Sequence, residues 1–178
     1  MGLALSRELV SKGWKVALAD IQENAELSKE LGDSAQFFKT NVADYDSQAA
    51  TFQGVFDKWG RIDALCANAG IVDRSSIYIF EHKGSDKIPP APDLLTTDVD
   101  YKGVVYGTQL SIHFMRKNPT PGGRIVTTAS AAAIYPHESY PEYDGAKAAV
   151  LNFVRATGRV LRIVCTFAII LTSCRNAC

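Results

Sequence analysis

A tyrosine and a lysine stand four residues apart in the segment "YDGAK", at Tyr143 and Lys147. If this segment is helical, both side chains project from the same face, because residues one turn apart are neighbours on a helix surface. An ammonium group beside a phenol favours the phenolate form, which makes the phenol a usable proton donor and acceptor near neutral pH. The pair is therefore suited to proton transfer.

A hydroxyl group precedes this pair by thirteen residues, at Ser130. It ends the apolar segment 122–130, which predicts a strand. At such a position a hydroxyl can hold or polarise a substrate oxygen. Serine, tyrosine and lysine in this order are much rarer than the Tyr-Lys pair alone, so the three residues form the candidate catalytic group.

The sequence resembles the short-chain dehydrogenase/reductase family in four blocks that occur in the family's order. Ser130 and the segment 143–147 match its Ser and Tyr-x-x-x-Lys. "CANAGI" at 66–71 is similar to the family's Asn-Asn-Ala-Gly turn, and "DVDYKGVVYGTQLSIHFM" at 98–115 to its long central helix. The resemblance covers most of residues 1–160 and implies hydride transfer between a nicotinamide cofactor and an alcohol or ketone.

The resemblance implies a role for each polar group. Tyr143 would exchange a proton with the substrate oxygen, and Ser130 would orient that oxygen. Lys147 would assist the tyrosine and bind the nicotinamide ribose. Asp100 stands where the family usually has an asparagine that holds a water molecule of the proton relay. A carboxylate there would help to keep the lysine charged but would oppose a tyrosinate.

The cofactor site also follows from the resemblance. Gly2 matches the last glycine of the family's phosphate-binding turn. Asp20 would accept both hydrogens of the adenosine ribose diol and repel a 2′-phosphate, which favours NAD and makes NADP the less expected cofactor. A helix cap is the alternative role for this acid. The other residues implied to contact the cofactor are Asn41, Val42, Asn68, Ala69, Gly70, Tyr143 and Lys147.

Strands and helices are expected to alternate along the chain, because short apolar runs alternate with amphipathic segments that end at glycines. Strands are predicted at 15–20, 35–41, 61–70 and 122–130, and helices at 3–12, 22–31, 46–59, 93–117 and 141–158. This alternation predicts an α/β fold with a doubly wound parallel sheet and helices on both faces. Ligands of such sheets bind beyond the carboxyl ends of the strands, where Asp20, Asn41, Asn68 and Ser130 stand.

The expected Rossmann-like sheet is incomplete at both ends. The family opens with a strand and a glycine-rich turn, of which only the last glycine, Gly2, has a counterpart here. We therefore expect a partial dinucleotide-binding and catalytic domain over 1–160, without the first strand and without the C-terminal substrate-covering part. Loss of the first strand would expose the edges of its two neighbours. Residues 161–178 are predicted to be an aberrant, apolar and Cys-rich tail, whose run 163–171 imitates a strand.

Composition limits the partners. The chain has 178 residues, and its 19 Lys and Arg balance its 19 Asp and Glu, so no basic surface for nucleic acid or for a membrane is expected. Segment 1–14 lacks the features of a secretory signal, which predicts a cytoplasmic protein. Cys165, Cys174 and Cys178 have the spacing of neither a zinc site nor a redox pair, and no metal site is expected.

Three functions stay open. The first is an NAD-linked oxidoreductase that acts on a small alcohol or ketone. The second is a catalytically inactive fragment of such an enzyme. The third is a module that pairs with intact relatives, or with itself, through the helices at 93–117 and 141–158, because the matching helices build the dimer interface in many family members. Measured turnover would favour the first function, and a mixed dimer the third.

Overall fold

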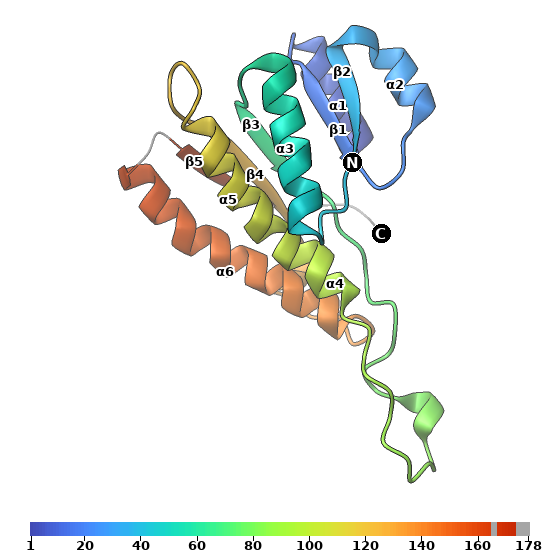
Figure 1. Ribbon diagram of the computed structural model, residues 1–178. Helices are drawn as coiled ribbons and strands as arrows, with labels where there is room; N and C mark the ends of the chain where they lie inside the picture. Colours follow the sequence, from blue (N-terminus) through green and yellow to red (C-terminus); the bar gives the residue numbers. More distant parts are fainter. Residues whose placement is uncertain (165–166, 174–178) are drawn as a thin grey trace.

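The computed structural model describes residues 1–164 and 167–173, with side chains up to Leu161. Helices and strands alternate along it (Figure 1). The strands are β1 (Val16–Asp20), β2 (Ala35–Lys39), β3 (Ala64–Ala67), β4 (Gly123–Ala129) and β5 (Phe167–Ser173). The α-helices are α1 (Gly2–Ser11), α2 (Ala25–Leu31), α3 (Tyr45–Trp59), α4 (Leu95–Thr97), α5 (Gly103–Met115) and α6 (Pro141–Val164).

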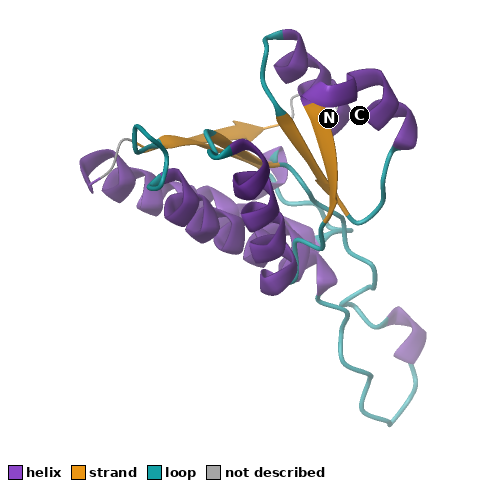
Figure 2. Ribbon diagram, turned by 45° about the horizontal axis from the view of Figure 1, so that its top comes forward, coloured by secondary structure: helices purple, strands orange, loops and turns teal. Residues whose placement is uncertain are grey.

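All strand pairs are parallel, which confirms the doubly wound α/β fold, but the sheet is divided in two. β1 pairs with β2 from Val16 opposite Ala35. β4 lies between β3 and β5, with Gly123 opposite Phe167. Within the described ranges, no strand lies between β1 and β3, and Figure 2 shows the two groups of strands apart. The sheet is thus Rossmann-like without its first strand, as the sequence predicts.

The helices form a layer that buries the larger part of the core. α3, α5 and α6 lie side by side along β3, β4 and β5 (Figure 1), whereas α1 and α2 accompany β1 and β2. Between α3, α5 and β4 the side chains of Phe52, Phe114, Met115 and Ile125 are buried, and the rings of Phe52 and Phe114 stack with centroids 5.9 Å apart. The core therefore lies between this layer of helices and the sheet of β3, β4 and β5.

Local sequence explains where the helices begin and end. Asn24 and Asp44 accept hydrogen bonds from the backbone N–H groups of Leu27 and Ser47, and so cap α2 and α3. Gly60 ends α3 in the left-handed region with φ 70°, which a residue with a Cβ rarely adopts.

Several boundaries differ from the predicted ones. The helix expected to stop at Gly158 continues to Val164, because Gly158 is buried and packing overrides its low helix propensity. The predicted division at residue 160 therefore falls inside α6, and the segment that follows forms β5, paired with β4 along seven residues. The strand expected at 61–70 is shorter, Ala64–Ala67. The helix expected at 93–117 consists of α4, a π-helical turn at Asp98–Lys102 and α5.

Asn118 provides a test of the core. Its side chain accepts a hydrogen bond from Ile62 N–H at 3.0 Å and donates to the carbonyls of Ile62 at 2.8 Å and Gly122 at 3.1 Å. Asn118 is 4% exposed, so Asn118→Ala leaves buried backbone groups unpaired. We expect the free energy of unfolding to fall by about 2–4 kcal/mol in chemical denaturation.

Asn152→Ala is the matched control for Asn118→Ala. Asn152 is exposed, and its amide makes a 3.3 Å bond to Ala148 O within α6. This variant should change the free energy of unfolding by less than about 0.5 kcal/mol. Equal losses in the two variants would contradict the role of Asn118 in the core.

Candidate active site

A cavity of about 270 Å³ lies where the carboxyl ends of β3 and β4 meet the first turns of α6. Ser130, Tyr143 and Lys147 all line it, so the fold brings the three candidate catalytic residues together. Ser130 follows β4 directly, and the other two belong to α6. The remaining lining residues are Met1, Asn68, Gly70, Ile71, Val72, Thr128 and Ala129.

Lys147 is buried and forms an ion pair with Asp100. Its ammonium nitrogen lies 2.9 Å from Asp100 Oδ2 and 3.2 Å from the carbonyl oxygen of Thr128, to which it donates. The two charged side chains are 4% and 0% exposed. The Lys147 nitrogen also lies 5.5 Å from the centre of the Tyr143 ring. An ammonium has three N–H donors, and the hydrogen bond to Thr128 uses one of them.

Asp100 reaches this position from the π-helical turn at Asp98–Lys102, a distortion that often occurs at functional sites. Its Oδ1 accepts a 2.8 Å hydrogen bond from the backbone N–H of Ile71. Burial raises the pKa of Asp100, while the Lys147 charge and the Ile71 N–H act in the opposite direction. A Cβ at Gly70 would lie 3.0 Å from Asp100 Oδ2 and 3.1 Å from Lys147 Nζ, so the ion pair needs a glycine here.

The backbone of Tyr143 is held by Asp73, a residue that the sequence analysis missed. Asp73 Oδ1 accepts from Tyr143 N–H at 2.8 Å, and Oδ2 accepts from Glu142 N–H at 3.0 Å. Glu142 in turn accepts from the N–H and the hydroxyl of Thr97, at 2.8 and 2.9 Å. The first turn of α6 is therefore fixed to the segment after β3 and to α4.

Little in the sequence indicates the residues that hold the first turn of α6 in place. Asp73 lies 70 positions before Tyr143 and caps α6 only because the fold joins the two segments. Asp144, in the first turn of α6, accepts from the backbone N–H of His137, and its Oδ1 lies 3.1 Å from His137 Nδ1. Acids in a first helical turn are common, so the sequence could have suggested Asp144 but not its partner.

Ser130 caps the 3₁₀ turn Ala131–Ala133, where its oxygen accepts from Ala132 N–H at 3.2 Å. As the acceptor of this bond, the hydroxyl keeps its own hydrogen for another partner. Beside it, Thr128 donates to Asn68 Oδ1 at 3.2 Å, which fixes the amide of Asn68 at the cavity. The cavity thus presents a hydroxyl, a phenol and an ammonium group, which can together handle a proton on a small oxygen-containing molecule.

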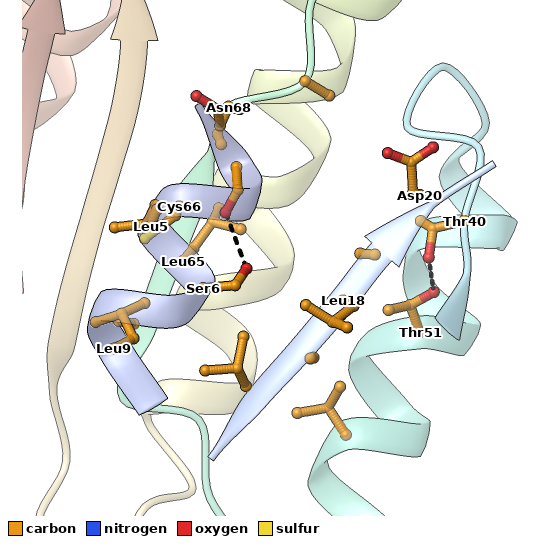
Figure 3. Close-up of a pocket in the computed structure, with 18 of the residues that line it drawn as sticks. Leu5, Ser6, Leu9, Leu18, Asp20, Thr40, Thr51, Leu65, Cys66 and Asn68 are labelled. Atoms are coloured by element: carbon orange, nitrogen blue, oxygen red, sulfur yellow. Dashed lines mark hydrogen bonds between the residues drawn. The ribbon is translucent and has the colours of Figure 1, made fainter. Parts of the chain in front are cut away.

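A second cavity, of about 950 Å³, contains several of the residues predicted to bind the cofactor. Gly2, Asp20, Val42, Asn68 and Ala69 line it, whereas Gly70 belongs to the smaller cavity and Asn68 to both. Asp20 and Asn68 lie at the same end of this cavity (Figure 3).

Asp20 and Asn41 each make a local contact. Asp20 Oδ1 accepts from Gln22 N–H at 3.2 Å in a turn before α2, and because Asn24 caps that helix, the alternative role of Asp20 as a helix cap is wrong. Asn41 is outside both cavities: its Oδ1 accepts from Ala43 N–H at 3.1 Å and closes a turn before α3. The contact of Asn41 with the cofactor stays a prediction.

The residues at this end suit a dinucleotide. The N-terminus of α1 lies here without a side-chain cap, so its first N–H groups can meet phosphate oxygens. Gly2 lies beside Asn68: a Cβ on Gly2 would be 3.5 Å from Asn68 Nδ2, which is an ordinary contact. None of the helices in the described part of the chain has the length and apolar character of a membrane span. The same residues include no cluster of three acidic, His or Cys side chains arranged to hold a metal.

The fold matches solved structures of dehydrogenases. A short-chain dehydrogenase/reductase from Burkholderia phymatum, solved in complex with NAD, superposes with a TM-score of 0.84. The match covers 97% of this chain and 60% of that chain, at 23% sequence identity. At this level of identity the likeness concerns the fold.

The sequence also matches curated relatives. The short-chain dehydrogenase/reductase prx6 of Penicillium rubens is 55% identical over 167 residues, which are 91% of this chain and 56% of the relative. Human 15-hydroxyprostaglandin dehydrogenase [NAD(+)] is 30% identical over 164 residues, 88% of this chain and 56% of the relative. The chain thus spans little more than half the length of these relatives. A model of the short chain dehydrogenase family matches residues 1–164, and the chain therefore belongs to the short-chain dehydrogenase/reductase family.

Proposed function

We propose that this chain carries the catalytic residues of an oxidoreductase that transfers hydride between NAD and a small alcohol or ketone. The observation that supports this most is the shared cavity of Ser130, Tyr143 and Lys147, which adjoins the larger cavity at Asn68. Family membership supports a nicotinamide cofactor, since the Burkholderia phymatum relative was solved with NAD. The balanced charge fits a cytoplasmic protein that acts on a neutral molecule.

In this proposal the chain handles the proton and the nicotinamide ring supplies or accepts the hydride. Tyr143 gives its hydroxyl proton to the carbonyl oxygen of a ketone, or takes the proton from an alcohol. Ser130 donates its remaining hydrogen to the same oxygen and fixes its position. Lys147 stabilises the tyrosinate by its charge, and its ammonium group also donates to a ribose hydroxyl.

Asp100 takes part in the proposal through Lys147. The carboxylate lies against the ammonium and holds it beneath the Tyr143 ring, while Ile71 N–H fixes the carboxylate itself. The negative charge opposes a second negative charge on the tyrosine, so the ion pair partly offsets the help that Lys147 gives. We therefore assign Asp100 a positioning role.

An inactive protein is the second candidate, for one structural reason. The proposed nucleotide end of the large cavity lies between the two parts of the divided sheet. Among the described residues, no strand connects the part that carries α1 with the part that carries β3, so no strand supports the N-terminus of α1 at this end. In that case the helices α5 and α6 would serve as a surface for pairing with intact relatives or with a second copy.

Titration of the purified chain with NADH, followed by fluorescence, separates the two candidates. Saturation at micromolar concentration supports the oxidoreductase, and its absence supports the inactive protein. The catalytic assignment is then tested in a preparation that oxidises an alcohol with NAD. Tyr143→Phe should lower turnover at least about 100-fold, because only the proton-transferring hydroxyl is lost. NADH affinity should change less than about threefold.

The control for Tyr143→Phe is Tyr140→Phe. Tyr140 is 41% exposed and lines neither cavity, so loss of its hydroxyl should leave turnover within about twofold. Substantial turnover by Tyr143→Phe would overturn the assignment of the proton donor.

Asp20→Ala tests the choice between NAD and NADP. Removal of the carboxylate removes both the acceptor for the ribose diol and the repulsion of a 2′-phosphate. We expect affinity for NADPH relative to NADH to rise about tenfold or more in parallel titrations. Asp33→Ala, which removes an exposed acid from the Gly32–Ser34 turn, serves as the control for net charge. An unchanged preference in Asp20→Ala would leave Asp20 only its hydrogen bond to Gln22 N–H.

Asp100→Asn tests the buried ion pair through pH. Because the pKa of Asp100 is raised above its ordinary 3.8 in the folded chain, the native state binds this proton more tightly than the unfolded chain. The ionisation therefore costs stability as pH rises from 3.8 through the raised pKa. We expect wild type to lose stability relative to Asp100→Asn over that window in urea unfolding, with a constant difference above it.

Below this window Asp100 is protonated in wild type, so neither protein has the ion pair there, and the constant difference between them reflects only the exchange of a carboxylic acid for an amide. Asp98→Asn is the control, since Asp98 is partly exposed and pairs with Lys102 at 2.8 Å. A difference between wild type and Asp100→Asn that does not vary with pH would contradict the raised pKa.

A further inference from the structure

Tyr143 lies in the first turn of α6, and the end of a helix is the part that opens most readily. The N–H groups of a first turn have no partner within the helix and need acceptors from elsewhere. Here Pro141 has no N–H to satisfy, and Asp144 N–H donates to a backbone carbonyl just before the helix at 3.0 Å. The N–H groups of Glu142 and Tyr143 both donate to Asp73, which therefore completes the hydrogen bonding of the turn.

Asp73 differs from the residues that cap α2 and α3. Asn24 and Asp44 each stand directly before their helix and accept from one N–H group with one side-chain oxygen. Asp73 accepts with both of its oxygens, from N–H groups that lie 69 and 70 positions away in the sequence. The position of the first turn of α6 therefore depends on a distant segment of the chain.

The segment that carries Asp73 is itself well fixed. Ile71 N–H donates to Asp100 Oδ1 at 2.8 Å, and the carbonyl oxygen of Val72 accepts from the hydroxyl of Thr96 at 3.0 Å. Thr96 and Asp100 are 1% and 0% exposed. The segment after β3 thus holds the acidic partner of the buried lysine as well as the turn that carries the proposed proton donor.

A second contact holds the loop that leads into this turn. Tyr78 stands five residues after Asp73, and its hydroxyl donates to the carbonyl oxygen of Glu138 at 2.9 Å. Glu138 in turn stands five residues before Tyr143. The two contacts therefore fix this part of the chain at both of its ends.

We propose that Asp73 is a positioning residue for the proton step, because it keeps the first turn of α6 closed and Tyr143 in the cavity with Ser130 and Lys147. Without its two oxygens the N–H groups would turn to water, which favours opening of the turn. A displacement of about 1 Å at a reacting group can cost about 100-fold in rate. The inference rests on the proposed function for the proton step, but not for the closure of the turn.

Amide hydrogen exchange of the purified chain tests the closure of the turn without any need for turnover. In Asp73→Ala we expect the amides of 142–144 to exchange at least about tenfold faster than in wild type. Exchange within α5 should stay as in wild type, which shows that the variant is folded. Tyr78→Phe removes one exposed hydrogen bond and should speed exchange in the loop 134–140 about threefold.

Asp44→Ala is the matched control, because it removes the cap of a helix that lies outside the small cavity. This variant should speed exchange in the first turn of α3 and leave that of 142–144 unchanged. Asp73→Asn keeps one acceptor oxygen of the two. Its exchange at 142–144 should therefore lie between those of wild type and Asp73→Ala.

The effect on the proton step is measured in a preparation that oxidises an alcohol with NAD. Turnover is expressed per NADH-binding site, so that unfolded protein is not counted. In Asp73→Ala kcat should fall at least about tenfold, whereas KM for NAD should change less than about threefold, because the proposed nucleotide end belongs to the other cavity. Asp73→Asn should recover part of kcat, and Asp44→Ala should keep it within about twofold.

Unchanged exchange at 142–144 in Asp73→Ala would overturn the proposal. Faster exchange throughout the chain would also overturn it, since that would mean a general loss of stability. So would fast exchange at the turn with an unchanged kcat per site, because closure of the turn would then not serve the proton step. A wild type without turnover would overturn the oxidoreductase and the role in the proton step, and the exchange rates would still decide whether Asp73 holds the turn.

Discussion

The buried ion pair between Lys147 and Asp100 is the constraint on which the candidate site depends. Two opposite charges are withdrawn from water here, which is tolerated only where other polar groups complete their hydrogen bonds. Thr128 O and Ile71 N–H do so, at 3.2 and 2.8 Å. These bonds bring four parts of the chain together: β4, α6, the π-helical turn and the segment after β3. Removal of either charge would leave the other buried without a partner.

Because the sheet is divided, β1 and β2 need other contacts with the rest of the molecule. Several of these contacts come from α3. Phe38 of β2 packs edge-on against Trp59 with ring centroids 6.5 Å apart. The hydroxyl groups of Thr40 and Thr51 lie 2.7 Å apart and are buried. A Cβ at Gly54 would lie 3.0 Å from the Phe38 ring, so this helix approaches the strand closely. One helix thus carries the contacts that a complete sheet would share with a central strand.

The sequence predicted the order and type of the main elements, because apolar periodicity and glycine stops are local. The sequence also predicted the group of Ser130, Tyr143 and Lys147, which line one cavity in the structure. Of the polar residues predicted at the strand ends, Asn41 lies outside both cavities. The hydrogen bond that Asp73 accepts from Tyr143 N–H could not be predicted, because it joins residues 70 positions apart and depends on the conformation of the loop. The continuation of α6 through Gly158 was missed for a similar reason: a local helix breaker was outweighed by burial, which only the folded chain determines.

The segment 76–92 extends from the body of the molecule, as the green excursion at the foot of Figure 1 shows. It leaves and returns through a narrow neck, where Arg74 lies 3.5 Å from Asp93 and Ser75 accepts from Asp93 N–H at 3.3 Å. Asp73, just before the neck, already holds Tyr143. Within the excursion, the Tyr78 hydroxyl donates to the carbonyl oxygen of Glu138 at 2.9 Å, so its first residues also contact the loop before α6. Because its ends are fixed together, a change in the length of the part beyond Tyr78 costs little closure entropy and should leave the backbone of Tyr143 where Asp73 holds it.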